Sequence, residues 1–395
     1  MKIVVIKQGR EKSIERLHPW VFSGAIAKVS GNVSSGDIIQ LQNTTGRFLG
    51  YGHYSEHSQI AVRVWSFQES VPLDVSLLKN RLREAINFRQ QSINTELTNC
   101  YRIANSEADQ LPGLIVDRYD NFLVCQFLTA GVDSWRQEIV NALCELLNPR
   151  GIYNRSDADV REKEGLNLES GVLFGEMPPE RVPVLENGHT FLVDVQKGHK
   201  TSCYLDQRDN RNLLGQYARG KEILNCFSYS GGYCVYALKN GADKVINVEA
   251  SAITLDLLKE NMSANNIAED KYETICADVF ELLRKYRDKN RKFDIIILDP
   301  PKFVESKNAL MSGARGYKDI NLLAFKLLKP GGLFFTFSCS GHVNSALFQK
   351  IVADAAVDAK RSTKIIKRLE QSICHNTSLN FPEGDYLKGL LISVN

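Results

Sequence analysis

The chain has 395 residues, of which 43% are hydrophobic and 24% charged, and its formal net charge is +3. This composition is typical of a folded globular protein and excludes collagen-like, coiled-coil and largely disordered chains. The length predicts two or three domains. No apolar run approaches the roughly 20 residues that span a bilayer, so no membrane segment is expected. The short apolar run 3–6 between two lysines predicts an edge strand rather than a signal peptide.

Nine cysteines are present, an odd number without a C-x-x-C pair. This count fits neither a disulfide framework nor a zinc site, so we expect a reduced, cytoplasmic protein without a metal. The sequence leaves the oligomeric state open, and a homo-oligomer is compatible with it.

Charge is spread unevenly along the chain. Residues 71–180 carry 17 acidic and 11 basic side chains, whereas the segments before and after them are net basic. Contacts with a polyanion are therefore expected at the two ends. The densest basic cluster is 284–292, which is either a nucleic-acid contact or a solvated helix end.

Residues 1–72 are predicted to form a small β-barrel module, because short alternating runs such as 60–65 are separated by glycine-containing turns. The first part of this module places basic residues next to aromatic ones. Lys12, Arg16 and Trp20 are therefore candidate RNA-binding residues. The alternative for the aromatic residues is a packed corner.

Residues 73–185 are predicted to form a central α/β domain, with a helix over 73–98 and a proline-rich linker near 175–183. Over 186–395 apolar strands alternate with helices, which predicts a doubly wound parallel sheet. We expect strands at 222–227, 244–249, 272–276, 293–299, 332–338 and 386–394, and helices at 232–240, 251–265, 279–287 and 316–329.

A cofactor pocket is expected beyond the carboxyl ends of these strands. The turn after the first strand lacks the G-x-G-x-x-G pattern, which argues against NAD and FAD. Glu249 ends the second strand, where it could accept ribose hydroxyls, and Asp278 follows the third, where it could accept from an adenine amine. Acidic groups also suit a cationic sulfonium, so we predict S-adenosylmethionine. The candidate cofactor-binding residues are Phe227, Ser228, Gly231, Gly232, Glu249, Asp278 and Asp299.

The candidate catalytic residues are Asp299 and Cys339, at the ends of the fourth and fifth strands. Two prolines after Asp299 fix the backbone there. Many amino-methyltransferases of nucleic acids carry an aromatic residue directly after such a pair. Here Lys302 takes that place and Phe303 follows, and both are candidate RNA-binding residues.

Cys339 suggests a specific chemistry. A thiolate that adds to carbon 6 of a pyrimidine makes carbon 5 able to attack a methyl group, and Asp299 would steady the base. The alternative for Cys339 is an inert, buried thiol.

Several stretches resemble the family of ribosomal RNA large subunit methyltransferase I, bacterial cytosine-5 methyltransferases of 23S ribosomal RNA. The stretches are 18–25, 199–201, 204–209, 225–232, 299–304, 316–321 and 337–340. The resemblance covers essentially the whole chain. It implies an N-terminal PUA domain, a central α/β domain and a C-terminal Rossmann-like methyltransferase, with Cys339 as nucleophile and 23S ribosomal RNA as partner. Better-known cytosine-5 RNA methyltransferases carry a second cysteine where this chain has Lys302, so the base that removes the carbon-5 proton is not identified.

Two other functions stay open at this point. One is an RNA methyltransferase that acts on an exocyclic amine or on guanine and needs no cysteine. The other is a non-catalytic, RNA-binding ribosome assembly factor that keeps a cofactor fold. Activity without Cys339 would favour the first, and failure to bind S-adenosylmethionine would favour the second.

Overall fold

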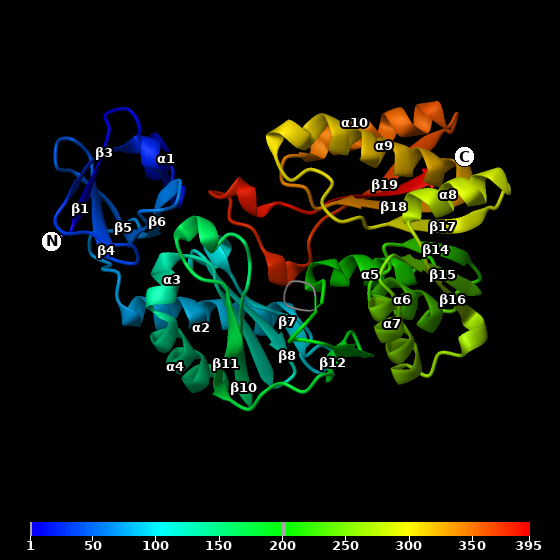
Figure 1. The fold of residues 1–395 in the computed structure, drawn as a ribbon, viewed down its shortest axis with the longest axis horizontal. Helices are drawn as coiled ribbons and strands as arrows, with labels where there is room; N and C mark the ends of the chain where they lie inside the picture. The colour runs from blue at the N-terminus through cyan, green and yellow to red at the C-terminus, as the bar shows by residue number, and fades with distance from the viewer. Residues whose placement is uncertain (1, 199–202) are drawn as a thin grey trace. The chain divides into compact units, whose positions relative to one another are not determined.

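The structure is a computed structural model that describes residues 2–198 and 203–395 (Figure 1). The stretch 199–201, one of those that carry the resemblance, lies outside the described residues. The chain divides into two compact units. The first consists of Met1–Glu186, Val193–Leu205 and Ile373–Gly384, and the second of Asn187–Leu192, Asp206–Ser372 and Asp385–Asn395.

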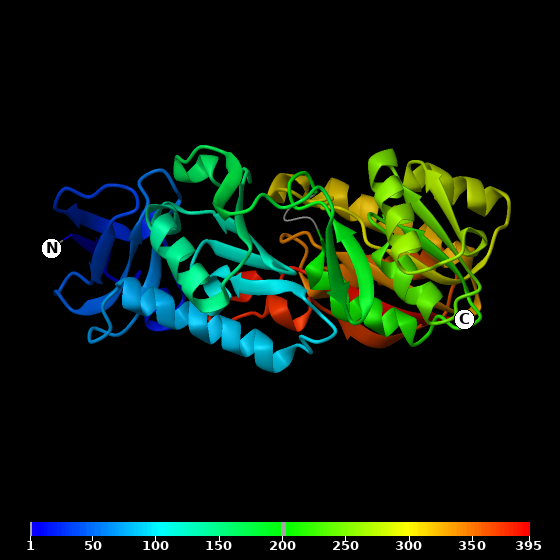
Figure 2. The same cartoon turned by 90° about the horizontal axis from the view of Figure 1, so that it is seen from below.

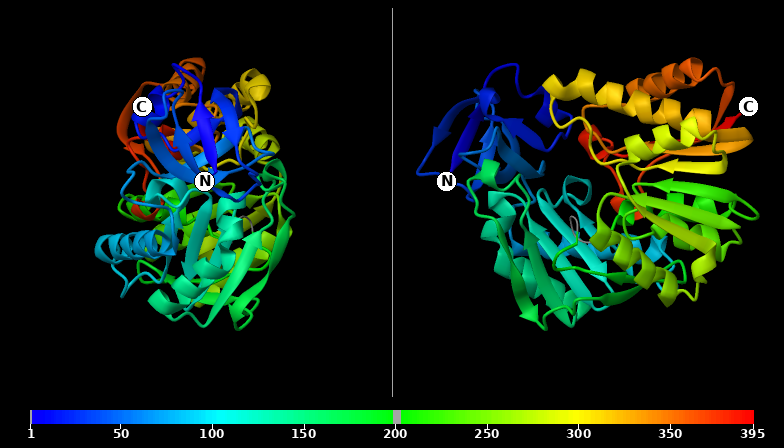
Figure 3. Two further views of the ribbon diagram at one scale, coloured as in Figure 1. Left: turned by 90° about the vertical axis from the view of Figure 1, so that its left-hand side faces the viewer. Right: turned by 45° about the vertical axis from the view of Figure 1, so that its right-hand side comes forward.

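The first unit begins with a six-stranded sheet that encloses its own apolar core (Figure 3). Its strands are β1 (Ile3–Ile6), β2 (Trp20–Phe22), β3 (Ile26–Ser30), β4 (Ile38–Gln42), β5 (Phe48–Tyr54) and β6 (Ile60–Ser66), in the order β2-β6-β5-β4-β1-β3, and the short helix α1 (Lys12–Glu15) follows β1. The predicted β-rich module is confirmed. The prediction of an edge strand at 3–6 is wrong, because β1 pairs with β3 on one side and β4 on the other while Val4 and Ile6 are buried in the core.

A five-stranded sheet in the order β11-β10-β9-β8-β7 forms the second part of this unit, with α2 and α4 packed against it (Figure 2). The elements are α2 (Val75–Ser92), β7 (Cys100–Asn105), β8 (Leu114–Tyr119), β9 (Phe122–Phe127), α3 (Ala130–Ser134), α4 (Arg136–Leu147), β10 (Gly151–Ser156) and β11 (Glu169–Gly175). Helix α2 confirms the helix predicted in this region. It begins at Val75 because the Asp74 carboxylate accepts a hydrogen bond from the Leu77 amide at 2.8 Å.

The C-terminal part of the chain returns once to the first unit, through Ile373–Gly384. The Arg89 guanidinium donates to the carbonyl of Cys374 at 2.9 Å and to the side-chain oxygen of Asn376 at 2.8 Å. Nothing in the sequence pattern indicates this return, because the contacts join residues almost 300 positions apart. The two-stranded sheet of β12 (Val182–Glu186) and β13 (His189–Val193) lies along the path from one unit to the other.

The second unit contains a seven-stranded sheet in the order β16-β15-β14-β17-β18-β20-β19, with α8, α9 and α10 on one face and α5, α6 and α7 on the other (Figure 1). Its strands are β14 (Glu222–Cys226), β15 (Lys244–Glu249), β16 (Tyr272–Cys276), β17 (Phe293–Leu298), β18 (Leu328–Ser338), β19 (Thr363–Leu369) and β20 (Lys388–Val394). Its helices are α5 (Arg208–Gly215), α6 (Gly232–Lys239), α7 (Ala252–Ala264), α8 (Val279–Asp288), α9 (Leu310–Leu327) and α10 (Ser345–Asp358). Strands β14 to β18 are parallel to one another, which confirms the doubly wound sheet, whereas β20 runs antiparallel to β18 and β19.

Several elements of this unit differ from the prediction. Helices α5 and α10 were not predicted, and β18 begins at Leu328, four residues earlier than expected. Helix α9 begins at Leu310, six residues earlier than expected, and includes Gly313. A Cβ at Gly313 would lie 2.3 Å from the Cγ2 atom of Val304, so this glycine lets the helix approach the Pro-Pro turn closely. Strand β19 was not predicted, because six of its seven residues are exposed and show no apolar alternation. No helix within 2–198 and 203–395 is long and apolar enough to cross a membrane.

Candidate active site

The carboxyl ends of the parallel strands gather the candidate residues of the second unit along one edge of the sheet. Strand β14 lies between β15 and β17, so the strand order reverses there, and ligands of doubly wound sheets bind at such a switch point. Glu249 ends β15, Asp299 follows β17 and Cys339 follows β18. The structure therefore brings together, in order along the edge, Asp278, Glu249, the loop 227–232, Asp299 and Cys339.

The loop after β14 contains three residues with positive φ angles. Phe227 and Tyr229 have φ angles of 59° and 45°, in a region that residues other than glycine rarely adopt. Gly231 has a φ of 83°, and a Cβ there would lie 2.6 Å from Cγ of Leu258. Conformations of this kind persist only where the surroundings fix them, and they cluster at ligand sites.

Ser228 supplies a direct test of whether this loop fits a polar ligand. Its hydroxyl oxygen is buried and has no hydrogen-bond partner among the residues that the structure describes. Leaving such a group unsatisfied costs about 1–3 kcal/mol. S-adenosylmethionine carries a carboxylate, an ammonium group and ribose hydroxyls, any of which can complete this hydrogen bond. The loop therefore fits the predicted cofactor.

Glu249 and Asp278 both bond to backbone amides. One carboxylate oxygen of Glu249 accepts from the Tyr229 amide at 3.0 Å and the other from the Ala250 amide at 2.8 Å. Glu249 thus ties the end of β15 to the loop after β14. Asp278 is exposed and caps α8, with one oxygen accepting from the Glu281 amide at 3.0 Å.

We expect Glu249→Ala to weaken S-adenosylmethionine binding by about 1–3 kcal/mol, or roughly 5- to 150-fold, because a charged acceptor and a tie to the loop are lost together. Glu249→Gln keeps one oxygen acceptor, so its affinity for S-adenosylmethionine should lie between those of wild type and Glu249→Ala. Calorimetric titration measures both variants, with Glu269→Ala, on an exposed turn, as the control. An unchanged affinity in Glu249→Ala would show that residues other than Glu249 bind the ribose.

Cys339 lies in a turn that is tied to the Pro-Pro turn after β17. Its side chain is half-buried, with Sγ 3.9 Å from the carbonyl oxygen of Pro300. The next residue, Ser340, accepts from the Val304 amide at 3.3 Å and shares a hydrogen bond with the Tyr317 hydroxyl at 3.0 Å. These contacts hold Cys339 beside the turn that begins at Asp299.

Other cysteines of this unit are poorer nucleophiles. Cys226 and Cys234 are fully buried, and burial raises the pKa of Cys226 well above its ordinary value and that of Cys234 to about 12. Because the thiolate is the reactive form, both thiols are inert at neutral pH. Cys276 is exposed but ends β16, on the far side of the cofactor loop from Asp299.

The two residues after Asp299-Pro300-Pro301 have different surroundings. Lys302 is exposed at the end of the turn. Phe303 is half-buried in an aromatic cluster, with its ring 4.7 Å from that of Tyr317, 5.8 Å from that of Phe280 and 6.4 Å from that of Phe227. RNA binding by either residue stays a prediction, and Phe303 has packing partners of its own.

Among the candidate RNA-binding residues of the first module, Trp20 is packed against other side chains, whereas Lys12 and Arg16 are exposed. Trp20 donates its indole N–H to Glu107 at 2.7 Å, and its ring packs on Phe381 at 4.8 Å. This arrangement fits the packed aromatic corner that the sequence left open. Lys12, in α1, and Arg16, directly after it, are both exposed.

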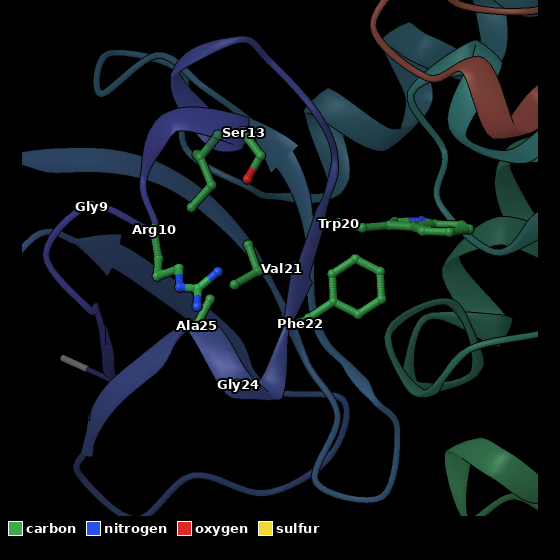
Figure 4. A pocket seen from close by; sticks show the side chains of 9 residues that line it. Gly9, Arg10, Ser13, Trp20, Val21, Phe22, Gly24 and Ala25 are labelled. Atoms are coloured by element: carbon green, nitrogen blue, oxygen red, sulfur yellow. The ribbon is translucent and has the colours of Figure 1, made fainter.

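A pocket of about 380 Å³ lies next to α1 (Figure 4). Its lining includes Arg10, Ser13, Trp20 and Phe22, and the Phe22 side chain is exposed. The sequence places Arg10 among the basic residues beside an aromatic run that ends at Phe22, but neither residue was a candidate RNA-binding residue. Their exposure is the property that the sequence does not reveal.

The three arginines of the basic cluster 284–292 form ion pairs within the unit. Arg284 bonds to Asp319 and Arg291 to Glu222, while Arg287 lies 2.8 Å from Asp288. These ion pairs fit the interpretation as a solvated helix end. Contact of the cluster with RNA stays a prediction.

The sequence also missed Lys388, the first residue of β20, because the run 386–394 was interpreted only as a strand. Lys388 is buried at the site edge, and its ammonium group donates to the carbonyl of Ser340 at 2.9 Å. The lysine at the start of an otherwise apolar strand was the sequence feature that could have indicated a buried charge here. Tyr317 was noted only within a stretch typical of the family.

Comparison with known proteins decides the family. A protein of Enterobacter sp. (strain 638) named ribosomal RNA large subunit methyltransferase I is 47% identical over 391 residues, which cover 99% of both chains. A protein of Shewanella amazonensis with the same name is 48% identical over the same length and the same share of both chains. The chain belongs to the family of ribosomal RNA large subunit methyltransferase I.

Two family descriptions match parts of this methyltransferase. Residues 4–67 match the PUA-like domain, and residues 168–391 match an S-adenosylmethionine-dependent methyltransferase. The solved structure of a methyltransferase complexed with SAH has a TM-score of 0.87, and that of a SAM-dependent methyltransferase from Streptococcus mutans has a TM-score of 0.86. Each covers 100% of both chains at 24% identity, so each shows the shared fold.

These findings confirm the predicted PUA-like module, the C-terminal methyltransferase and S-adenosylmethionine as the cofactor. When bound, the cofactor supplies an electrophilic methyl group on a cationic sulfur. The residues that would hold it are those of the loop 227–232 together with Glu249 and Asp278. The domain limits 1–72, 73–185 and 186–395 stay predictions.

Proposed function

We propose that this methyltransferase transfers the methyl group to carbon 5 of a cytosine in 23S ribosomal RNA, with Cys339 as nucleophile. One observation carries the proposal: a half-buried thiol lies 3.9 Å from the Pro300 carbonyl, in the turn that begins at Asp299. An enzyme that methylates an amine has no use for a thiol at this point, whereas carbon-5 chemistry requires one. The names of the relatives support ribosomal RNA as the substrate.

The reaction begins when the Cys339 thiolate forms a bond to carbon 6 of the ring. The electron pair of the 5,6 double bond then becomes available at carbon 5, which would take the methyl group from the cofactor, whose bond between methyl carbon and sulfur breaks with the electron pair going to the sulfur. The carbon-5 proton leaves to a base, and the bond between sulfur and carbon 6 breaks to restore the thiolate and the aromatic ring. Asp299 accepts a hydrogen bond from the exocyclic amine, and its carboxyl group gives ring nitrogen 3 the proton that neutralises the negative charge formed as the thiolate adds. The proton returns to Asp299 when the thiolate leaves.

The target cytosine has to leave its helix before it reaches this edge of the sheet. Unstacking a base costs a few kcal/mol unless the RNA is already open, so a loop or another unpaired segment is the expected target. Exposed Lys302 would contact the adjacent phosphate. The PUA-like module, with exposed Lys12 and Arg16, would supply further backbone contacts.

We expect the double variant Lys12→Ala/Arg16→Ala to reduce the slope of log K against log salt concentration for ribosomal RNA by about 1–2, because each phosphate contact contributes roughly 0.7–0.9. Binding of S-adenosylmethionine should not change. Filter binding at several salt concentrations measures the slope, with Lys364→Ala on exposed β19 as the control. An unchanged slope would remove α1 and its flank from the RNA-binding surface.

Point variants are preferable to deletion of 1–72. Arg63 in the first sheet pairs with Glu164 at 2.8 Å, and both side chains are almost fully buried. Deletion would leave Glu164 buried without its cation, and breaking such a pair costs about 3–5 kcal/mol. A loss of RNA binding in the deletion variant would therefore not separate recognition from folding.

The product identifies the reaction directly. Mass spectrometry of nucleosides from ribosomal RNA incubated with the enzyme and S-adenosylmethionine should show 5-methylcytidine. A methyl group on an exocyclic amine or on guanine would instead support the first alternative function. Absence of methyl transfer together with RNA binding would support an assembly factor.

A further inference from the structure

Lys388 lies in the turn region that holds Cys339. Strand β20 runs antiparallel to β18, and the register sets Lys388 opposite Ser338, the residue before Cys339. The Lys388 side chain is 5% exposed, so its ammonium group is shielded from water. A buried lysine needs partners for its charge and its hydrogens.

The ammonium group bonds to two backbone carbonyls. It donates to Ser340 at 2.9 Å and to Tyr386 at 2.6 Å, which fixes its nitrogen beside the residue that follows Cys339. Three hydrogens are available on this group, so one remains after these two bonds. A cation is therefore held rigidly next to the Cys339 turn.

The charged groups around Lys388 act in opposite directions. Burial lowers the pKa of Lys388, whereas Asp385 and an ionised Cys339 favour its charged form, and Lys302 opposes it. Tyr317 also faces this turn, and burial raises its pKa, so it remains a neutral phenol. Asp299 lies on the neighbouring turn, where an ionised carboxylate would oppose ionisation of Cys339.

We infer that Lys388 is a positioning residue that stabilises the thiolate of Cys339. The inference rests on the proposed function, since only a nucleophilic Cys339 makes use of a stabilised thiolate. A cation beside a thiol favours its ionised form, and the effect is large where water does not screen it. Lys302 is exposed, so its contribution is weakened by solvent.

The rate at which iodoacetamide alkylates Cys339 tests whether Lys388 stabilises the thiolate, and the experiment needs no RNA. The full-length protein is treated over pH 6–10, and the rate is followed on the peptide that contains Cys339 by mass spectrometry. Lys388→Gln removes the charge but keeps a hydrogen-bond donor, and we expect its alkylation at pH 7.5 to fall about tenfold, with the half-maximal pH shifted upward. Lys388→Arg should retain most of the rate, and Lys364→Gln on exposed β19 should match wild type.

An unchanged alkylation profile in Lys388→Gln that still binds S-adenosylmethionine would overturn the inference. If Lys388→Gln fails to fold, Lys388→Arg decides, because a rate near wild type supports the role of the charge and a tenfold loss contradicts it. Failure of the proposed function appears separately, as methylation that persists in Cys339→Ser. The two results are therefore distinguishable.

Discussion

Cys339→Ser is expected to abolish methylation of ribosomal RNA while leaving S-adenosylmethionine binding close to wild type. A hydroxyl is nearly isosteric with the thiol but far harder to ionise near neutral pH, so addition to carbon 6 should almost stop. Loss of a nucleophile lowers kcat by on the order of 10³-fold or more. Transfer of a radiolabelled methyl group measures the rate, and Cys276→Ser, at an exposed strand end, is the control.

The wild-type enzyme should also form a covalent complex with RNA in which 5-fluorocytosine replaces the target cytosine. Fluorine at carbon 5 cannot leave as a proton does, so the bond between Cys339 and carbon 6 should persist in a denaturing gel. Digestion should locate the adduct in the peptide that contains 337–340. Full activity of Cys339→Ser would refute both the nucleophile and the carbon-5 chemistry, and an adduct on Cys226 would keep the chemistry but refute the assignment.

Asp299→Asn is expected to lower kcat/KM by roughly 10²-fold or more, because the amide can hydrogen-bond to the base but cannot give ring nitrogen 3 the proton that neutralises the charge formed when the thiolate adds. The 5-fluorocytosine adduct should form correspondingly more slowly. Single-turnover methylation and the rate of adduct formation measure this effect. Asp288→Asn, at the exposed end of α8, changes the same functional group away from the site and should behave as wild type.

Binding of S-adenosylmethionine separates the two roles predicted for Asp299. If the carboxylate acts on the base alone, the calorimetric Kd of Asp299→Asn stays within a few-fold of wild type. If Asp299 also holds the cofactor, the Kd rises together with the loss of rate. Wild-type kcat/KM in Asp299→Asn would remove this residue from the catalytic machinery.

The parallel strands of the second unit and the residues that follow them could be predicted from the sequence, whereas the order of the strands in the sheet could not. The apolar runs that became β14, β15 and β17 are buried on both faces, so their hydrophobicity is nearly continuous and their ends are sharp. Because parallel strands end at one edge, the residue after each strand belongs to the site. This rule brought Glu249, Asp299 and Cys339 together before any contact was known.

The sequence by itself thus determined the parallel strands and the residue types at each strand end, since these follow from local hydrophobic patterns and connectivity. Only the tertiary structure showed that Lys388 is buried beside the Cys339 turn, that Trp20 packs on Phe381 and that Arg284 and Arg291 are paired with carboxylates. These contacts join residues far apart in the chain. Burial and pairing depend on which elements meet in space, and the periodicity of a single segment carries no information about its distant neighbours.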